Sequence, residues 1–158
     1  MPQGQNRGLE EGFITQSKVW KRRYGGDLIS LYPYIIPADY YFDRRINKME
    51  QYYEDAKELA GRFNSCHGVS TVPPVPVSNM FHIHFSLPKE EMEMVLIEVQ
   101  QQTGIGITGY LIEVDEKTCY FEASMGDLYK NVPKEAITNA FSRLDEVMKQ
   151  RFYTPKGS

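Results

Sequence analysis

The sequence predicts an α+β fold, in which a small, mainly antiparallel sheet carries helices on one face and is preceded by a long helix. The stretch Asn79–Leu87 alternates apolar and polar residues, which is the period of a β-strand. Two more strand-like stretches, Ile105–Val114 and Cys119–Met125, are joined by the turn residues Asp115–Thr118. Apolar residues recur at helical spacing before, between and after these strands. The helical segments are 38–63, 89–103 and 133–152.

Length and composition limit the possible functions. A chain of 158 residues is by default one domain, and its net charge of −3 argues against a surface for nucleic-acid phosphates. No apolar run is long enough to span a bilayer, and Met1–Gly8 lacks the apolar region of a signal peptide. The two cysteines, Cys66 and Cys119, suit a reduced compartment. We therefore expect a cytoplasmic protein that binds neither nucleic acid nor membrane.

The first 37 residues differ in character from the rest. Met1–Gly8 is polar and rich in Gly and Gln, and we expect it to be a disordered lead. Leu9–Tyr24 is a predicted helix that ends at the following glycine pair. Asp27–Ile36 is nearly all apolar and would expose a large patch in water. We expect the segment 9–37 to join or pack on a partner surface, and Asp27–Ile36 to support self-association into a homo-oligomer.

The other elements form one predicted small domain, residues 38–152, followed by a tail, 153–158. Val69–Val72 is a short strand or an extended piece, followed by a proline-rich turn. These prolines help to fix where the Asn79–Leu87 strand begins, because proline cannot donate to a central ladder. The long helix is expected at Ala38–Phe63. The domain ends with a helix, Pro133–Phe152, that carries an apolar stripe on one side.

The Asn79–Leu87 strand organises the predicted sheet, because its alternation places two sets of side chains on opposite faces. The apolar set is expected to lie under the helices and comprises Phe81, Ile83, Phe85 and Leu87. The other set is expected to meet water or another domain and comprises Met80, His82, His84 and Ser86.

His82 and His84 are the first candidate site, since two imidazoles on one strand face have a spacing seen in metal sites. A third ligand could come from His67, Cys66 or Cys119, but no spacing requires it. We favour the alternative, a polar strand face or a contact with another domain, and predict no metal site.

Two further candidates involve residues of the predicted hairpin. Cys119 and a histidine could form a nucleophilic pair, but Cys119 shares a strand face with Phe121 and is better explained as a small core residue. Glu113 and Glu122 could face each other across the hairpin and raise one carboxyl pKa, although a solvated edge is the commoner arrangement. We assign no catalytic residue to this chain.

A basic cluster precedes the glycine pair and comprises Lys18, Lys21, Arg22 and Arg23. It could be a solvated helix end, where cations interact favourably with the helix dipole. It could equally recognise a phosphate or a carboxylate through paired guanidinium donors. Both alternatives stay open at this point.

Three segments, in this order, resemble the β-eliminating lyase/threonine aldolase family. Phe13–Leu28 (FITQSKVWKRRYGGDL), followed by LYPYII, resembles the segment downstream of the family's cofactor lysine. Val77–Phe85 (VSNMFHIHF) resembles a strand of the small C-terminal domain, and Phe121–Asp127 (FEASMGD) with the final helix resembles that domain's last strand and helix. The resemblance covers Phe13 to about Phe152. It implies the aspartate aminotransferase type of fold, pyridoxal phosphate as cofactor and a small amino-acid substrate.

The resemblance also indicates what this chain lacks. The family's Schiff-base lysine lies upstream of the segment seen here, and Met1–Gly8 contains no lysine. We therefore expect an N-terminal large domain to be missing, and no pyridoxal phosphate to be bound by the chain alone. Arg22 matches a basic position near the family's cofactor site, and Arg23 is its neighbour. Ile29 stands where the better-known threonine aldolases carry an arginine, so the substrate stays open.

Two functions from different classes follow from this sequence. The first is the C-terminal part of a pyridoxal-phosphate-dependent lyase or aldolase that acts on a β-hydroxy or β-substituted amino acid. The second is a non-catalytic α+β module that associates with another chain through Asp27–Ile36.

Overall fold

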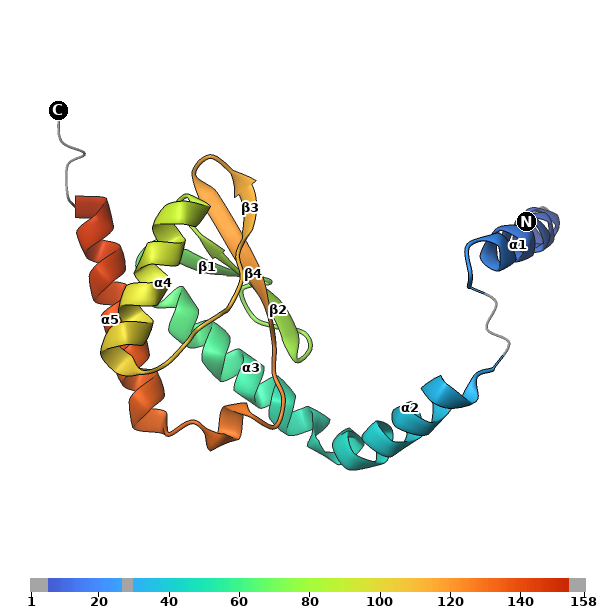
Figure 1. Cartoon of the computed structure of the whole chain (residues 1–158), viewed down its shortest axis with the longest axis horizontal. Coiled ribbons are helices and arrows are strands. Elements are labelled where there is room, and N and C mark those ends of the chain that lie inside the picture. The colour runs from blue at the N-terminus through green and yellow to red at the C-terminus, as the bar shows by residue number, and fades with distance from the viewer. Residues whose placement is uncertain (1–5, 27–29, 154–158) are drawn as a thin grey trace, which may run out of the picture. The chain divides into compact units, whose positions relative to one another are not determined.

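The structure is a computed structural model that describes the backbone of residues 6–26 and 30–153 and the side chains of residues 12–26 and 30–152 (Figure 1). The chain divides into two compact units between Ile46 and Asn47. The sequence predicted a boundary between residues 37 and 38, which lies inside a helix of the first unit.

The first unit contains two helices, α1 (Asn6–Arg23) and α2 (Tyr32–Arg45). α1 ends as predicted at the glycine pair, where Gly25 has a φ of 73°, a conformation that glycine adopts without strain. The helix begins at Asn6, inside the segment Met1–Gly8 that was expected to be disordered, so that prediction is corrected for residues 6–8.

α2 was not predicted as a helix over its full length. Its first turn contains Pro33. Proline has no backbone N–H, but N–H groups in the first turn have no partner within the helix, so no helical hydrogen bond is lost. The long helix expected at Ala38–Phe63 is divided by a short 3₁₀ segment, η1 (Ile46–Lys48), which separates α2 from α3 (Met49–Asn64). The N-terminal part of the Asp27–Ile36 run, residues 27–29, lies outside the described residues.

The second unit is built on a four-stranded antiparallel sheet in the order β1-β2-β4-β3. The strands are β1 (Val69–Val72), β2 (Met80–Phe85), β3 (Ile112–Asp115) and β4 (Thr118–Ser124). β3 is shorter than the predicted strand 105–114, because Gly106 and Gly109 interrupt the apolar residues that precede Ile112. The β3–β4 turn is closed by the Asp115 carboxylate, which accepts a hydrogen bond from the Lys117 backbone N–H at 2.8 Å.

Three helices cover one face of this sheet, as Figure 1 shows for α3, α4 and α5. α4 (Lys89–Thr103) has the predicted bounds, and α5 (Lys134–Tyr153) follows the short 3₁₀ segment η2 (Tyr129–Asn131). α4 ends at Gly104, whose positive φ of 73° is a conformation that glycine adopts without strain. The predicted α+β architecture, with an antiparallel sheet and helices on one face, is confirmed.

The alternation of β2 sets the position of the core. Its predicted inward residues Phe81, Ile83 and Phe85 are at most 3% exposed, whereas Met80 is 45% exposed on the other face. The buried side chains that meet β2 come from all three helices and from β4. They include Ala60, Phe63, Met92, Val95, Val99, Cys119, Phe121, Leu144, Val147 and Met148.

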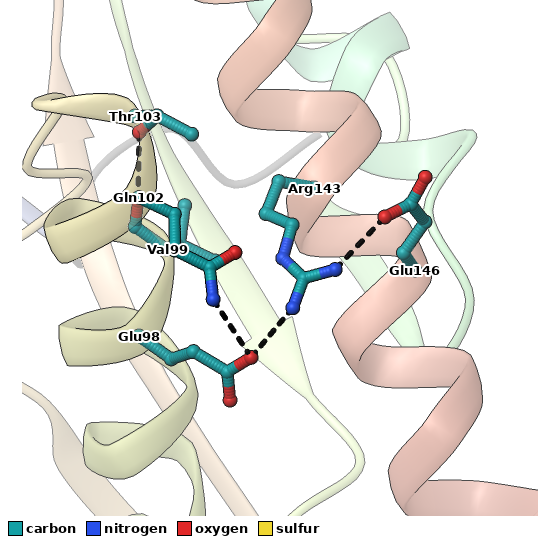
Figure 2. A network of polar contacts seen from close by, with 6 residues as sticks. All are labelled: Glu98, Val99, Gln102, Thr103, Arg143 and Glu146. Atoms are coloured by element: carbon teal, nitrogen blue, oxygen red, sulfur yellow. Dashed lines mark hydrogen bonds and ion pairs between the residues drawn. The ribbon is translucent and has the colours of Figure 1, made fainter.

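A polar network joins α4 to α5 at the edge of this core (Figure 2). The Arg143 guanidinium donates to Glu98 Oε1 at 2.7 Å and to Glu146 Oε2 at 2.9 Å, and Gln102 Nε2 donates to the same Glu98 oxygen at 3.4 Å. The hydrogen bonds that Arg143 donates to Glu146 and to Glu98 raise the pKa of its guanidinium. Because Glu98 belongs to α4 and Arg143 to α5, the network fixes the two helices relative to each other.

Replacing Arg143 with Ala should destabilise the fold by more than the loss of one exposed ion pair, because two charge-assisted bonds between neighbouring helices are lost. Chemical denaturation measures the change. Lys89→Ala is the control, since it removes only an exposed ion pair with Glu93 at 3.9 Å and should cost about 0.3–0.5 kcal/mol. Equal losses in the two variants would contradict a structural role for the network.

Candidate functional site

The face of the sheet opposite the helices carries a group of polar and aromatic side chains. The strand registers place these side chains in two rows across the sheet. One row runs through Ser70, His84, Tyr120 and Ile112, and the other through Val72, His82 and Glu122.

Each row contains one pair of side chains in contact, His84 with Tyr120 and His82 with Glu122. The His84 and Tyr120 rings stack with centroids 5.1 Å apart and an interplanar angle of 13°. His82 Nε2 lies 3.3 Å from Glu122 Oε2, and the Tyr110 hydroxyl donates to the Glu122 backbone carbonyl at 3.1 Å. The His82 and His84 rings are 6.2 Å apart, so the two rows are also in contact with each other.

The environment of His84 favours its neutral form. Partial burial lowers the pKa of His84 below its ordinary value of 6.5, and the neighbouring His82 lowers it further. The groups that face His84 are Ser70 on β1, His82 on its own strand and Tyr120 on β4. None of these is a carboxylate that could stabilise an imidazolium at His84.

Wild-type protein should therefore lose more stability than a His84→Phe variant as the pH falls below about 6.5. At pH values between the ordinary pKa of histidine and the lower pKa of His84 in the folded protein, the unfolded chain binds a proton at this residue and the folded protein does not. The stability that neutral His84 contributes is therefore fully present above this pH range and is lost as the pH falls through it. Phenylalanine retains a ring against Tyr120 but cannot titrate. Denaturation midpoints measured from about pH 7.5 to 5.5 test this, and parallel losses in both proteins would contradict it.

None of the three residues considered as a third metal ligand lies beside His82 and His84. His67 lies against Phe152, with ring centroids 4.8 Å apart, and Cys66 and Cys119 are both buried in the core. Within the described ranges, no three His, Cys, Asp or Glu side chains come together in a way that could hold a metal ion. The contacts that the structure gives these two histidines are with Glu122 and Tyr120 on the same sheet face, and the expectation of no metal site stays a prediction.

Cys119 is a core residue. It is fully buried, lies opposite Phe85 in the register of β2 and β4, and has a pKa raised to about 11, mainly by burial. A thiol in this environment stays protonated at neutral pH and is a poor nucleophile. The structure favours the core explanation over the nucleophilic one.

The pairing of Glu113 with Glu122, which the sequence allowed but which we did not favour, is absent from the structure. Glu113 lies opposite Cys119, whereas Glu122 lies opposite His82 on the other neighbouring strand. The register of β3 and β4 shifts between Glu113 and Asp115, which the sequence pattern did not indicate. The carboxylate of Glu122 is therefore paired with an imidazole rather than with another carboxylate.

Sequence reasoning also missed a polar contact centred on Asp127. Asp127 Oδ1 accepts hydrogen bonds from Lys48 Nζ and from the Tyr52 hydroxyl, each at 2.8 Å. These contacts tie the loop after β4 to the start of α3. The only signal in the sequence was the segment Phe121–Asp127, which had been noted for its resemblance and not for this contact.

The basic cluster lies on the last turns of α1, in the first unit. Its four side chains are exposed. The Arg23 guanidinium lies over the Trp20 ring, 5.6 Å from its centroid, whereas no polar contact of the Arg22 side chain is found with the described residues. A helix C-terminus repels anions, so any phosphate or carboxylate here would be held by the guanidinium groups and not by the helix backbone.

Comparison with known proteins finds solved structures that resemble this chain, and two of them are described here. One is a protein from Listeria monocytogenes assigned as an L-allo-threonine aldolase, with 53% sequence identity, a TM-score of 0.73 and a match to 86% of this chain. The other is a protein from Exiguobacterium assigned as an aromatic amino acid β-eliminating lyase/threonine aldolase, with 48% identity, a TM-score of 0.70 and a match to 85% of this chain. Neither a protein-family model nor a curated protein matches the sequence.

The chain spans only 38% of the length of either solved relative. Within that span, about half of the residues are identical and the fold is shared. The resemblance drawn from the sequence is confirmed: in sequence and in fold, the chain is similar to a C-terminal portion of a β-eliminating lyase/threonine aldolase family protein.

Proposed function

We propose that this chain is the C-terminal part of a pyridoxal-phosphate-dependent lyase that acts on a β-hydroxy or β-substituted amino acid. The observation that carries the proposal is the 53% identity to a protein assigned as an L-allo-threonine aldolase over 86% of this chain. The relative from Exiguobacterium is assigned to both threonine cleavage and β-elimination, so both reactions are candidates.

Pyridoxal phosphate in the parent enzyme would supply an electron sink for the bond that breaks next to the amino-acid α-carbon. The residues of this chain that fit the cofactor are cations. The guanidinium of Arg22 is exposed at the end of α1 and can hold a phosphate or carboxylate with paired donors. Arg23 already contacts Trp20 and has a smaller part in the proposal. No residue of this chain is proposed to carry out the bond cleavage.

The whole natural polypeptide that contains this sequence should cleave L-allo-threonine to glycine and an aldehyde, or eliminate a β-substituent from an aromatic amino acid, in a reaction that depends on added pyridoxal phosphate. The isolated 158-residue chain should do neither. Aldehyde release and keto-acid formation measure the two reactions. Activity of the isolated chain, or no activity of the whole polypeptide on either substrate class, would contradict the proposal.

In the whole polypeptide, Arg22→Ala should weaken cofactor or substrate binding about ten- to a hundredfold, because a charge-assisted bond of roughly 1.5–3 kcal/mol is lost. Arg22→Lys should restore little, since an ammonium cannot reproduce paired guanidinium donors. Arg23→Ala is the matched control and should bind almost normally. Binding titrations are compared with the melting temperature of the cofactor-free protein. Wild-type binding by Arg22→Ala, or a loss confined to stability, would remove Arg22 from the site.

The exposed apolar segment of the first unit favours a second candidate, a non-catalytic module that self-associates through Asp27–Ile36. Within the described part of this run, the exposed fractions of Leu31, Tyr34 and Ile36 lie between 54% and 64%. Burying one such side chain contributes roughly 1.5–3 kcal/mol, so even partial burial favours association of the isolated chain. Light scattering at micromolar concentration should detect a dimer or larger species, and Leu31→Asp should reduce it. A monomer unaffected by this substitution would exclude this candidate.

We propose a cytoplasmic location for the protein. Both cysteines are free and buried, as is common in proteins of a reducing compartment. None of the described helices is long and apolar enough to cross a membrane.

A further inference from the structure

The helix-free face of the sheet places a carboxylate beside aromatic rings. Tyr120 and Glu122 are two residues apart on β4, so their side chains lie on the same face of the sheet. The Tyr120 ring also contacts both histidines of β2, whose ring centroids are each 5.1 Å from its own. Glu122 is the only carboxylate in the two rows of this face, and neither row contains a lysine or an arginine. The face therefore presents one negative charge beside π-systems, and both features attract a cation.

The Glu122 carboxylate keeps one oxygen for such a cation. Its Oε2 lies 3.3 Å from His82 Nε2, whereas no contact of its Oε1 is found with the described residues. The side chain of Glu122 is 44% exposed, so this oxygen can be reached from solvent. Because a carboxylate accepts several hydrogen bonds at once, Glu122 can bind a cationic donor without releasing His82.

A guanidinium is the cation that fits this arrangement. It is planar, stacks on aromatic rings and donates paired N–H groups to a carboxylate, whereas an ammonium is a compact and strongly hydrated charge. This chain already contains such stacking in its first unit, where the Arg44 guanidinium carbon lies 4.0 Å from the centroid of the Tyr40 ring. On the sheet face the ring and the carboxylate are present, and the arginine has to come from outside the two rows.

Exposed apolar side chains on the same face indicate that this arginine belongs to a polypeptide. Val72 on β1 and Ile112 on β3 stand at the ends of the two rows, and Met80 stands at the start of β2. Their exposed fractions lie between 43% and 51%. This apolar rim can pack the methylene stem of an arginine and the apolar residues next to it in a chain. A free guanidinium compound would leave most of the rim in water.

We propose that the helix-free face of the second unit binds an arginine side chain of a separate polypeptide, with the guanidinium stacked on Tyr120 and paired with Glu122. Apolar residues beside that arginine pack on the rim formed by Val72, Met80 and Ile112. The inference concerns the second unit alone, so it does not depend on the proposed lyase reaction.

Fluorescence anisotropy of a labelled peptide, Gly-Val-Arg-Val-Gly, tests the proposal with the whole natural polypeptide and with the isolated chain. Matched peptides carry lysine, or citrulline, which keeps the planar group without its charge. The arginine peptide should bind both proteins at least about tenfold more tightly than the citrulline peptide, and more tightly than the lysine peptide. Equal binding of the arginine and citrulline peptides, lysine binding as tight as arginine binding, or binding confined to the isolated chain would overturn the proposal.

Substitutions on the sheet separate the two contacts of the guanidinium. Glu122→Gln should weaken binding of the arginine peptide at least about fivefold, because the charge is lost. Tyr120→Leu should weaken it at least about threefold, whereas Tyr120→Phe keeps a ring and should bind almost normally. Glu113→Gln is the matched control, since Glu113 lies opposite the buried Cys119 and should not affect binding. Wild-type binding by Glu122→Gln, or equal losses in the two Tyr120 variants, would contradict the assignment.

Competition by free L-arginine distinguishes a polypeptide partner from a small guanidinium compound. Free arginine has no apolar neighbours to pack on the rim, so it should displace the labelled peptide only at a concentration at least about tenfold higher than the unlabelled peptide requires. Displacement at the same concentration would assign the face to a small molecule and remove the polypeptide partner.

Discussion

The burial of one face of β2 is the constraint on which the second unit depends. Ile83 is fully buried beneath the helices, and the residues on either side of it in sequence must consequently lie on the helix-free face. A shift of one residue in register would exchange the two faces and expose the core. The apolar core and the His82–Glu122 and His84–Tyr120 pairs are therefore products of the same register.

The sequence predicted most of the second unit because its signals were local and agreed with one another. α4 is an example, since an apolar stripe at helical spacing is bounded by Pro88 and Gly104. The burial of Cys119 also followed from strand alternation. The irregularity in the β3–β4 register between Glu113 and Asp115 did not, because it depends on backbone geometry that residue types do not reveal.

The first unit was harder to predict because its stabilising contacts are not local. Pro33 and the apolar residues around it suggested an irregular run, yet a proline in the first turn is compatible with a helix. The division of the long helix at Ile46–Lys48 left no clear mark in the apolar spacing. The candidate site has the same difficulty. Arg22 is proposed as a binding residue because of the family resemblance, whereas the structure of this chain shows only that its side chain is exposed.

The two buried cysteines have a practical consequence for experiments on this protein. Burial raises the pKa of Cys66 and of Cys119 to about 11, so very little of either thiol is ionised at neutral pH. Thiol-reactive probes attack thiolates that they can reach, and neither native side chain meets both conditions in the folded state. A single cysteine introduced on an exposed position, such as Val77, could thus carry a spectroscopic label while both native cysteines stay in place.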